Sequence, residues 1–201
     1  MKKFELTSEF VTFLGKKLFR IKALISFGNV EEGELGGYVE KEENLSNDGN
    51  AWVYGNARVC GDARVYGDAR VCGDAEVCGD AEVCGDAEVC GDARVCGDAR
   101  VYGDARVYGN ARVYGDAEVY GDARVCGNAD YATVHGFGSE YRTTTFFRTK
   151  AGEIGVRCGC FYGTLEEFRA KIKETHGETK TAKEYLMVAD LMEFRFSKEE
   201  A

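Results

Sequence analysis

The chain of 201 residues contains no proline and only two histidines. Without proline, tight turns have to come from glycine followed by aspartate or asparagine, residues that tolerate left-handed backbone angles. An imidazole general base, the commonest choice near neutral pH, can only be His135 or His176. These two shortages limit both the turn chemistry and the catalytic chemistry that we can expect.

Long apolar runs and an excess of basic charge are also missing. Lysines and glutamates interrupt the first twenty residues, so they lack the apolar core of a signal peptide, and no window elsewhere is long enough to span a bilayer. We therefore expect a soluble, cytoplasmic protein without a membrane partner. The formal net charge of −9, with no basic face, argues against direct nucleic-acid binding.

What the chain has instead is a six-residue repeat. From Ala51 to Asn128 the unit Ala-(Arg/Glu)-Val-(Tyr/Cys)-Gly-(Asp/Asn) occurs thirteen times, and Trp52 is the one exception at the second position. Ala and Val are two residues apart, so on an extended segment both point to one side, while the second and fourth residues point to the other. The Gly-Asp or Gly-Asn pair then turns the chain. A triangular solenoid with three sides and about eighteen residues per coil is therefore predicted.

The order of charges at the second position agrees with this period. Residues eighteen apart have opposite charge in seven of nine pairs, for instance Arg58 with Glu76 and Glu76 with Arg94. Opposite charges on neighbouring strands stabilise a sheet. A period of twenty-four gives six of eight pairs, so the charges alone leave that alternative open, and the geometry of the hexad favours eighteen.

The stretch around the first repeats resembles a known family. Phe27-Gly28-Asn29-Val30, Gly36-Gly37-Tyr38-Val39-Glu40, Asn44-Leu45-Ser46 and Gly49-Asn50-Ala51-Trp52-Val53 are similar to the lead-in of YdcK-type β-solenoid proteins, and the following Gly-Asp-Ala-Arg-Val units match as well. The resemblance covers residues 25–134. It implies a mainly β fold, a left-handed parallel β-helix related in architecture to the hexapeptide-repeat acyltransferases, and says little about activity.

Two different end pieces are expected to flank the solenoid. Residues 1–32 form a β-rich N-terminal cap, with a hairpin of Phe10–Leu14 and Leu18–Ala23, and residues 33–134 form the β-helix, regular over 51–128. Residues 135–201 form a ββαα cap, with strands at Thr143–Arg148 and Ile154–Cys160. Its helices start at capping boxes that begin with Thr164 and Thr181. Their apolar faces need a partner, which can be the cap's sheet, the last coil or another subunit.

Nine cysteines and the corner aspartates raise the question of disulfides and metals. Seven cysteines exchange with tyrosine at the fourth position, so we interpret them as reduced thiols, packed as compact apolar residues; parallel side chains fit a disulfide poorly. Cys158 and Cys160 are interpreted as buried core. Stacked aspartates such as Asp62, Asp80 and Asp98 can attract calcium, but hydrogen bonding to the turn backbone is the favoured interpretation. We expect no metal site and no cofactor.

Two groups of residues are candidates for binding. The consecutive tyrosines 102, 108, 114 and 120 lie beside arginines, and both residue types anchor interfaces. A second cluster combines hydroxyls and guanidiniums that can hold a small anion. The candidates are Tyr102, Tyr108, Tyr114, Tyr120, Arg106 and Arg112 in the first group, and Arg142, Thr143, Thr144, Thr145, Arg148 and Arg157 in the second.

The preferred function is a non-enzymatic module that binds a macromolecule or a small anion, either as a monomer or as a dimer or trimer. The segment from Cys158-Gly159-Cys160-Phe161 to Glu166-Glu167-Phe168 resembles prophage-encoded accessory proteins. This resemblance implies an anti-defence role, with a host immune protein or its nucleotide signal as the target. The alternatives are an acyltransferase with His135 as base and an acyl-CoA donor, and a structural spacer.

Overall fold

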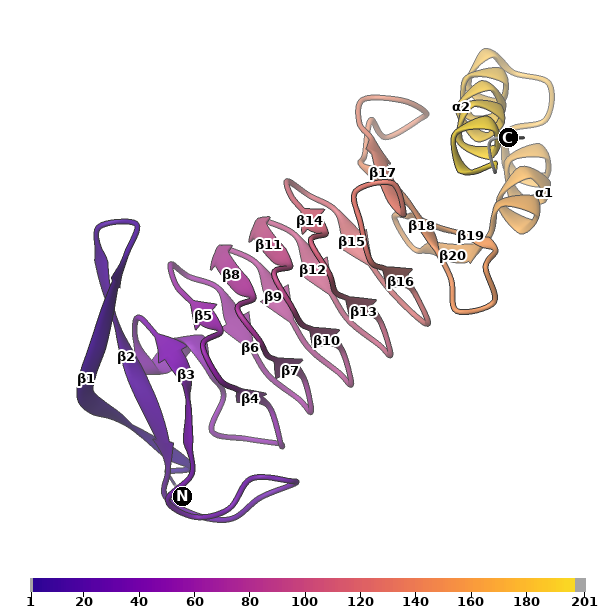
Figure 1. The fold of residues 1–201 in the computed structure, drawn as a ribbon. Coiled ribbons are helices and arrows are strands. Elements are labelled where there is room, and N and C mark those ends of the chain that lie inside the picture. Colours follow the sequence, from indigo (N-terminus) through magenta and orange to yellow (C-terminus); the bar gives the residue numbers. More distant parts are fainter. Residues whose placement is uncertain (1, 198–201) are drawn as a thin grey trace.

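The computed structural model describes residues 2–197, which form a rod with a different cap at each end (Figure 1). N-terminal strands cover one end, stacked coils make up the middle, and an antiparallel sheet with two helices covers the other end. The mainly β fold, the eighteen-residue coil and the two kinds of cap are as predicted from the sequence.

The N-terminal cap is a hairpin that continues into the solenoid. Strands β1 (Phe4–Phe13) and β2 (Lys16–Ala23) pair antiparallel around Leu14 and Gly15, which have φ angles of 48° and 77°. The predicted hairpin is confirmed, although its first strand begins six residues before Phe10. Strand β3 (Leu35–Val39) pairs antiparallel with β2 and parallel with the first hexad strand of its sheet, so cap and coils share one sheet.

Three parallel sheets form the sides of the solenoid, in about five coils. After a short 3₁₀ helix, η1 (Glu42–Asn44), each hexad contributes one short strand, and partners in neighbouring coils are eighteen residues apart. The first sheet adds β5 (Arg58–Val59), β8 (Glu76–Gly79), β11 (Arg94–Gly97) and β14 (Arg112–Val113) to β3. The second contains β4 (Trp52–Val53), β7 (Arg70–Val71), β10 (Glu88–Val89), β13 (Arg106–Val107) and β16 (Arg124–Val125). The third contains β6 (Arg64–Val65), β9 (Glu82–Val83), β12 (Arg100–Val101) and β15 (Glu118–Val119).

The alanines and valines of the repeats form the core, as the hexad pattern predicts. Every one of them from Ala51 to Val125 is at most 1% exposed. Trp52 is fully buried although its position faces outward in the other hexads, because Phe4 and Phe27 cover it, with ring centroids 6.3 and 5.4 Å away. The N-terminal segment therefore closes the first coil from the side as well as from the end.

Glycine at the corners is required by two constraints. Gly73, for example, has a φ of +70°, and a Cβ atom there would lie 2.9 Å from the amide nitrogen of Gly91 in the next coil. A side chain would therefore meet both backbone strain and a clash with the neighbouring corner.

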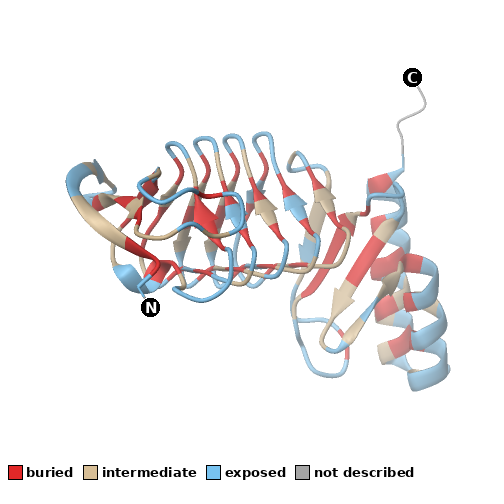
Figure 2. Ribbon diagram, turned by 90° about the horizontal axis from the view of Figure 1, so that it is seen from below, coloured by how far each residue is buried: buried red, intermediate tan, exposed pale blue. Residues whose placement is uncertain are grey.

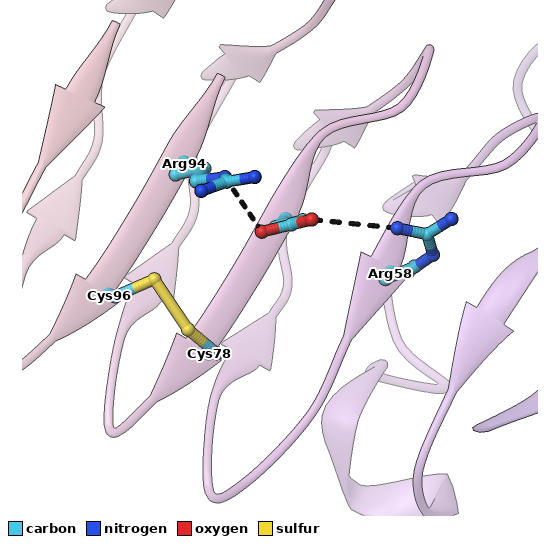
Figure 3. Close-up of a disulfide and its surroundings, with 5 residues drawn as sticks. Arg58, Cys78, Arg94 and Cys96 are labelled. Atoms are coloured by element: carbon cyan, nitrogen blue, oxygen red, sulfur yellow. Dashed lines mark hydrogen bonds and ion pairs between the residues drawn. A yellow bond between two sulfur atoms is a disulfide. The ribbon is translucent and has the colours of Figure 1, made fainter. Parts of the chain in front are cut away.

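The cysteine column contains two disulfides, which corrects our interpretation of all these residues as reduced thiols. Cys72 is bonded to Cys90, and Cys78 to Cys96 (Figure 3), with Cα–Cα distances of 4.6 and 4.7 Å. The same hexad position in adjacent coils falls within the Cα separation that a disulfide spans. The interpretation was wrong because it gave too much weight to the parallel direction of the side chains. Cys60, Cys84, Cys126, Cys158 and Cys160 are free.

The C-terminal cap has more strands than expected. Strands β17 (Tyr131–Val134), β18 (Thr144–Arg148), β19 (Ile154–Cys158) and β20 (Phe161–Thr164) form one antiparallel sheet, and both helices pack on one side of it (Figure 2). The capping box of Thr164 and Glu167 opens α1 (Leu165–His176) as predicted. Helix α2 (Lys180–Phe196) starts before the predicted box at Thr181, because Thr179 caps it by accepting from the Ala182 amide.

Side chains and backbone bonds join the cap to the last coil. Phe147 of β18 is fully buried in the solenoid core, and the backbone of Thr149 forms a bridge with Ala123. The amide of Glu118 donates to the Thr145 hydroxyl over 3.0 Å. The cap is thus packed directly onto the coils rather than joined to them by a linker.

Candidate functional site

The arginines and glutamates at the second position of the hexads are largely paired with each other. Glu76 lies between two arginines, 3.5 Å from Arg58 and 2.9 Å from Arg94 (Figure 3). Equivalent ladders join Glu88 with Arg70 and Arg106, and Arg100 with Glu82 and Glu118. Among the candidate arginines, Arg106 belongs to a ladder, whereas Arg112 stacks beside Arg94, a residue of its own charge. The second-position column is therefore occupied mainly by ion pairs within the rod.

The four candidate tyrosines do not form one patch. Tyr102 and Tyr120 follow β12 and β15 in the third sheet, and their rings lie 4.5 Å apart. Tyr108 follows β13 in the second sheet and Tyr114 follows β14 in the first, with 39% and 42% of their surfaces exposed. Consecutive hexads lie on different sides of a triangular coil, so neighbours in sequence face different directions.

Tyr102, Tyr120 and Arg157 belong to the joint between solenoid and cap. The Tyr120 ring packs edge-on against Tyr162 at 4.7 Å, and the Arg157 guanidinium lies 5.5 Å from the Tyr120 centroid. Arg157 also donates to Glu118 over 2.7 Å. Burial, followed by the hydrogen bond to Glu118, raises the pKa of Tyr102 to about 12. These candidates hold the cap in place.

The predicted anion cluster is dispersed. Thr144 and Thr145 are buried, donating to the Cys158 sulfur and accepting from the Glu118 amide, respectively. Arg148 donates to the carbonyl of Phe196 and lies over its ring. Side chains alternate between the two faces of β18, and on each face they already contact other residues of the cap or the last coil. Only Arg142, on the loop before β18, retains an exposed guanidinium beside a cavity.

His135, the candidate base, lies on the surface at the junction of rod and cap. Its Nδ1 is 3.0 Å from the hydroxyl of Thr143, which in turn donates to Asp116 of the last corner over 3.4 Å. This chain of contacts fixes the loop that leaves β17. His135 does not line any of the cavities described below.

The cap contains a concave site that sequence reasoning missed, which we call the cap hollow. Its volume is about 270 Å³, and it opens where the β19–β20 turn meets α1 and α2. Phe161 packs against Phe168 at 5.3 Å, Phe168 against Tyr185 at 5.8 Å, and Tyr185 against His176 at 5.7 Å. The residues lining it are Ser139, Glu140, Arg142, Cys158, Gly159, Cys160, Phe161, Phe168, Lys171, Ile172, Thr175, His176 and Tyr185.

A second apolar feature is exposed on α2 and is here named the α2 stripe. It consists of Met187, Leu191 and Phe194, which are 71%, 57% and 79% exposed. At the helical period these residues lie on the opposite side from Tyr185, Ala189 and Met192, which pack in the cap's core. The sequence indicated that the helix faces need partners; within residues 2–197, only one face of α2 packs against other residues.

A long groove follows one corner of the solenoid, with a volume of about 700 Å³. It is lined by residues of both charges, including Asp68, Asp86, Asp104, Arg106 and Lys150. Within residues 2–197, no group of three or more histidine, cysteine, aspartate or glutamate residues is arranged to hold a metal ion. The groove therefore offers alternating charges and no converging ligand set.

Comparison with known proteins identifies the repeats. Residues 57–73, 63–79, 93–107 and 105–121 match the YdcK Beta solenoid repeat. No curated protein matches the chain. In the part of the chain that the structure describes, neither helix is long and apolar enough to cross a membrane.

Proposed function

The coils of this chain are repeats of the YdcK beta-solenoid family, and from that premise we propose that the protein is a non-enzymatic binding module which docks a partner protein through its C-terminal cap. The α2 stripe carries this proposal. Three large apolar side chains exposed at intervals of four and three residues match the spacing with which a helix inserts into an apolar groove.

The surroundings of the stripe support a protein partner. Lys183 and Asp190 lie along one edge of it and Glu184 along the other, so an apolar centre has a charged rim of both signs, which is the usual composition of a protein interface. Asp190 is held by Arg169, which also binds Glu193, so these charges are fixed before a partner arrives. The stripe is therefore a preorganised surface on a rigid helix.

The anti-defence role expected from the sequence is a more specific version of this proposal. The partner is then a host immune protein, bound by the apolar stripe. The rival acyltransferase needs an acyl-CoA donor and His135 as base, and its only support is the position of His135 beside Thr143 and Asp116. A protein that acted only as a structural spacer would not need an exposed apolar stripe.

The test compares two surface variants that each replace one exposed leucine by glutamate. Leu191→Glu charges the middle of the stripe, whereas Leu14→Glu charges the tip of the N-terminal hairpin, where the leucine is 73% exposed. We expect a specific host protein to be captured from extract by the wild type and by Leu14→Glu, and at least tenfold less of it by Leu191→Glu. A charge at the centre of an apolar interface costs enough binding energy for this loss.

Light scattering on the same three proteins separates the alternatives. A wild type that is dimeric through the stripe, with a monomeric Leu191→Glu variant and no protein captured, would make the stripe a contact between copies and overturn the proposal. Coenzyme A turnover that is lost in His135→Ala would establish the acyltransferase instead.

A further inference from the structure

The cap hollow has walls of two kinds. One side is aromatic, formed by Phe161, Phe168 and Tyr185, with His176 stacked on Tyr185 at an interplanar angle of 26°. Ligand sites in proteins are concave and mostly apolar, with a few polar groups that fix orientation, and the hollow fits this description. Its flat aromatic faces favour a flat ligand.

The rim of the hollow carries more positive than negative charge. Arg142 and Lys171 are cationic and exposed, and Glu140 is the one carboxylate that lines the hollow. Arg142 lies only 3.6 Å from Glu140 through one nitrogen, which leaves other N–H groups of its planar fork for a second anion. Lys171 also pairs with Glu174 one helical turn further along α1, at 2.9 Å. An anionic group on the ligand therefore finds cationic partners at the rim.

The turn between β19 and β20 leaves room for the Arg142 guanidinium. Gly159 has a φ of +57°, and a Cβ atom there would lie 2.9 Å from Nη1 of Arg142. Glycine thus gives the turn its left-handed conformation and also lets the arginine rest against the backbone. The guanidinium thus lies beside the turn at the mouth of an apolar site.

We propose that the cap hollow binds a small aromatic molecule that carries a carboxylate or phosphate, with its ring against Phe161 and Tyr185 and its anion on Arg142. The volume of about 270 Å³ lies just below the usual range for drug-sized ligands, so the ligand is a single ring system with few substituents. The aromatic wall buries the ring, and the N–H groups of the guanidinium donate hydrogen bonds to the anion.

This site is separate from the surface used in the proposed function. Tyr185 faces the hollow, while Met187, Leu191 and Phe194 lie on the other side of α2. Binding of a small anion and docking of a protein can therefore be tested one at a time, and failure of either leaves the other standing.

Four probes separate the ring from the anion in an NMR titration of the full chain: phenyl phosphate, benzoate, phenol and inorganic phosphate. We expect phenyl phosphate or benzoate to bind saturably and at least tenfold more tightly than phenol and inorganic phosphate. The shifted signals should be those of residues around the hollow. The two anionic probes show whether the site takes a phosphate or a carboxylate.

Arg142→Gln removes the charge and keeps most of the side chain, and we expect it to weaken the better anionic probe about tenfold, the usual loss for a charged hydrogen bond. Arg112→Gln is the matched control, because Arg112 is an exposed arginine of the first sheet, and it should bind as the wild type does. Glu140→Gln should tighten binding two- to threefold by removing the competing carboxylate.

The proposal is overturned if phenol binds as tightly as phenyl phosphate, if Arg142→Gln and Arg112→Gln bind alike, or if neither anionic probe binds. The helical circular dichroism signal of Arg142→Gln should equal that of the wild type. If it does not, Glu140→Gln decides the question, since it removes no contact of the aromatic wall, and unchanged affinity in that variant also overturns the proposal.

Discussion

The solenoid and the C-terminal cap use apolar and charged residues in opposite ways. In the rod every inward alanine and valine is buried, and most second-position arginines and glutamates pair with a residue eighteen positions away. In the cap, three large apolar side chains of α2 are exposed and an aromatic hollow is open to solvent. Each coil of a repeat protein packs against a copy of itself, so its strand edges and apolar core find matching partners on the next coil. The exposed apolar stripe and the hollow occur where the repetition ends, and there we propose that binding takes place.

The largest expected effect compares an apolar residue of the rod with one of the cap. Val83→Asp places a carboxylate in a core position that is 0% exposed, and we expect a loss of more than about 4 kcal/mol in the free energy of unfolding. Leu191→Asp, on the exposed stripe, should change it by less than about 0.5 kcal/mol. Urea unfolding followed by circular dichroism measures both. Equal losses would mean that the stripe is not free surface.

Reduction of the disulfides should affect the rod and leave the cap unchanged. Each bond closes a sequence separation of 18, for which the chain-entropy account gives about 3 kcal/mol. Contacts in a solenoid are between neighbouring coils. We therefore expect hydrogen exchange to become faster in peptides from β7 to β11 and to stay unchanged in α1 and α2. A Cys72→Ser/Cys78→Ser double variant should show the same pattern without reductant. Equal acceleration in the helices would contradict the separation of the two regions.

The N-terminal coil contains a buried charge, in contrast to the exposed charges of the cap. Lys3 is 2% exposed, and its ammonium donates to the carbonyls of Gly49 and Ala51; burial lowers its pKa from 10.5 to about 8, opposed by Asp48 and Asp68. Between these two values the unfolded chain binds a proton that the folded chain lacks. Stability therefore rises as the pH increases from about 8 to 10.5.

The comparison with Lys3→Met isolates this contribution. Relative to that variant, the free energy of unfolding of the wild type should rise by roughly 2 to 3 kcal/mol across the interval, since one pKa unit corresponds to about 1.4 kcal/mol. Urea titrations at both ends of the interval measure the difference. A difference that is independent of pH would show that Lys3 stays protonated in the folded protein.

The rod could be predicted almost entirely from the sequence, because one short pattern determines side-chain direction, corner and stacking period at once. The hexad predicted the inward Ala and Val, and the charge order predicted pairs such as Glu76 with Arg94. Left-handedness stays a prediction from the family resemblance. The disulfides were missed because the parallel direction of the side chains was given more weight than the Cα spacing of adjacent coils, which a disulfide can span.

The cap and its hollow could not be predicted in the same way. Phe161, Phe168 and Tyr185 come from a strand and two helices that meet only after folding, and no local spacing links them. Arg142 was expected to act with Arg148 and Arg157, but these arginines contact Phe196 and Glu118 instead. The cytoplasmic location stays a prediction.

The pairing of residues eighteen apart also determines where the cap points. Insertion of one whole coil would lengthen the rod by about 4.8 Å and leave the cap facing the same way relative to the N-terminal hairpin. Insertion of a single hexad would instead rotate the cap by a third of a revolution. The number of hexads therefore has two effects. Each set of three hexads adds one coil and lengthens the rod, and any one or two additional hexads change the direction in which the stripe and the hollow face.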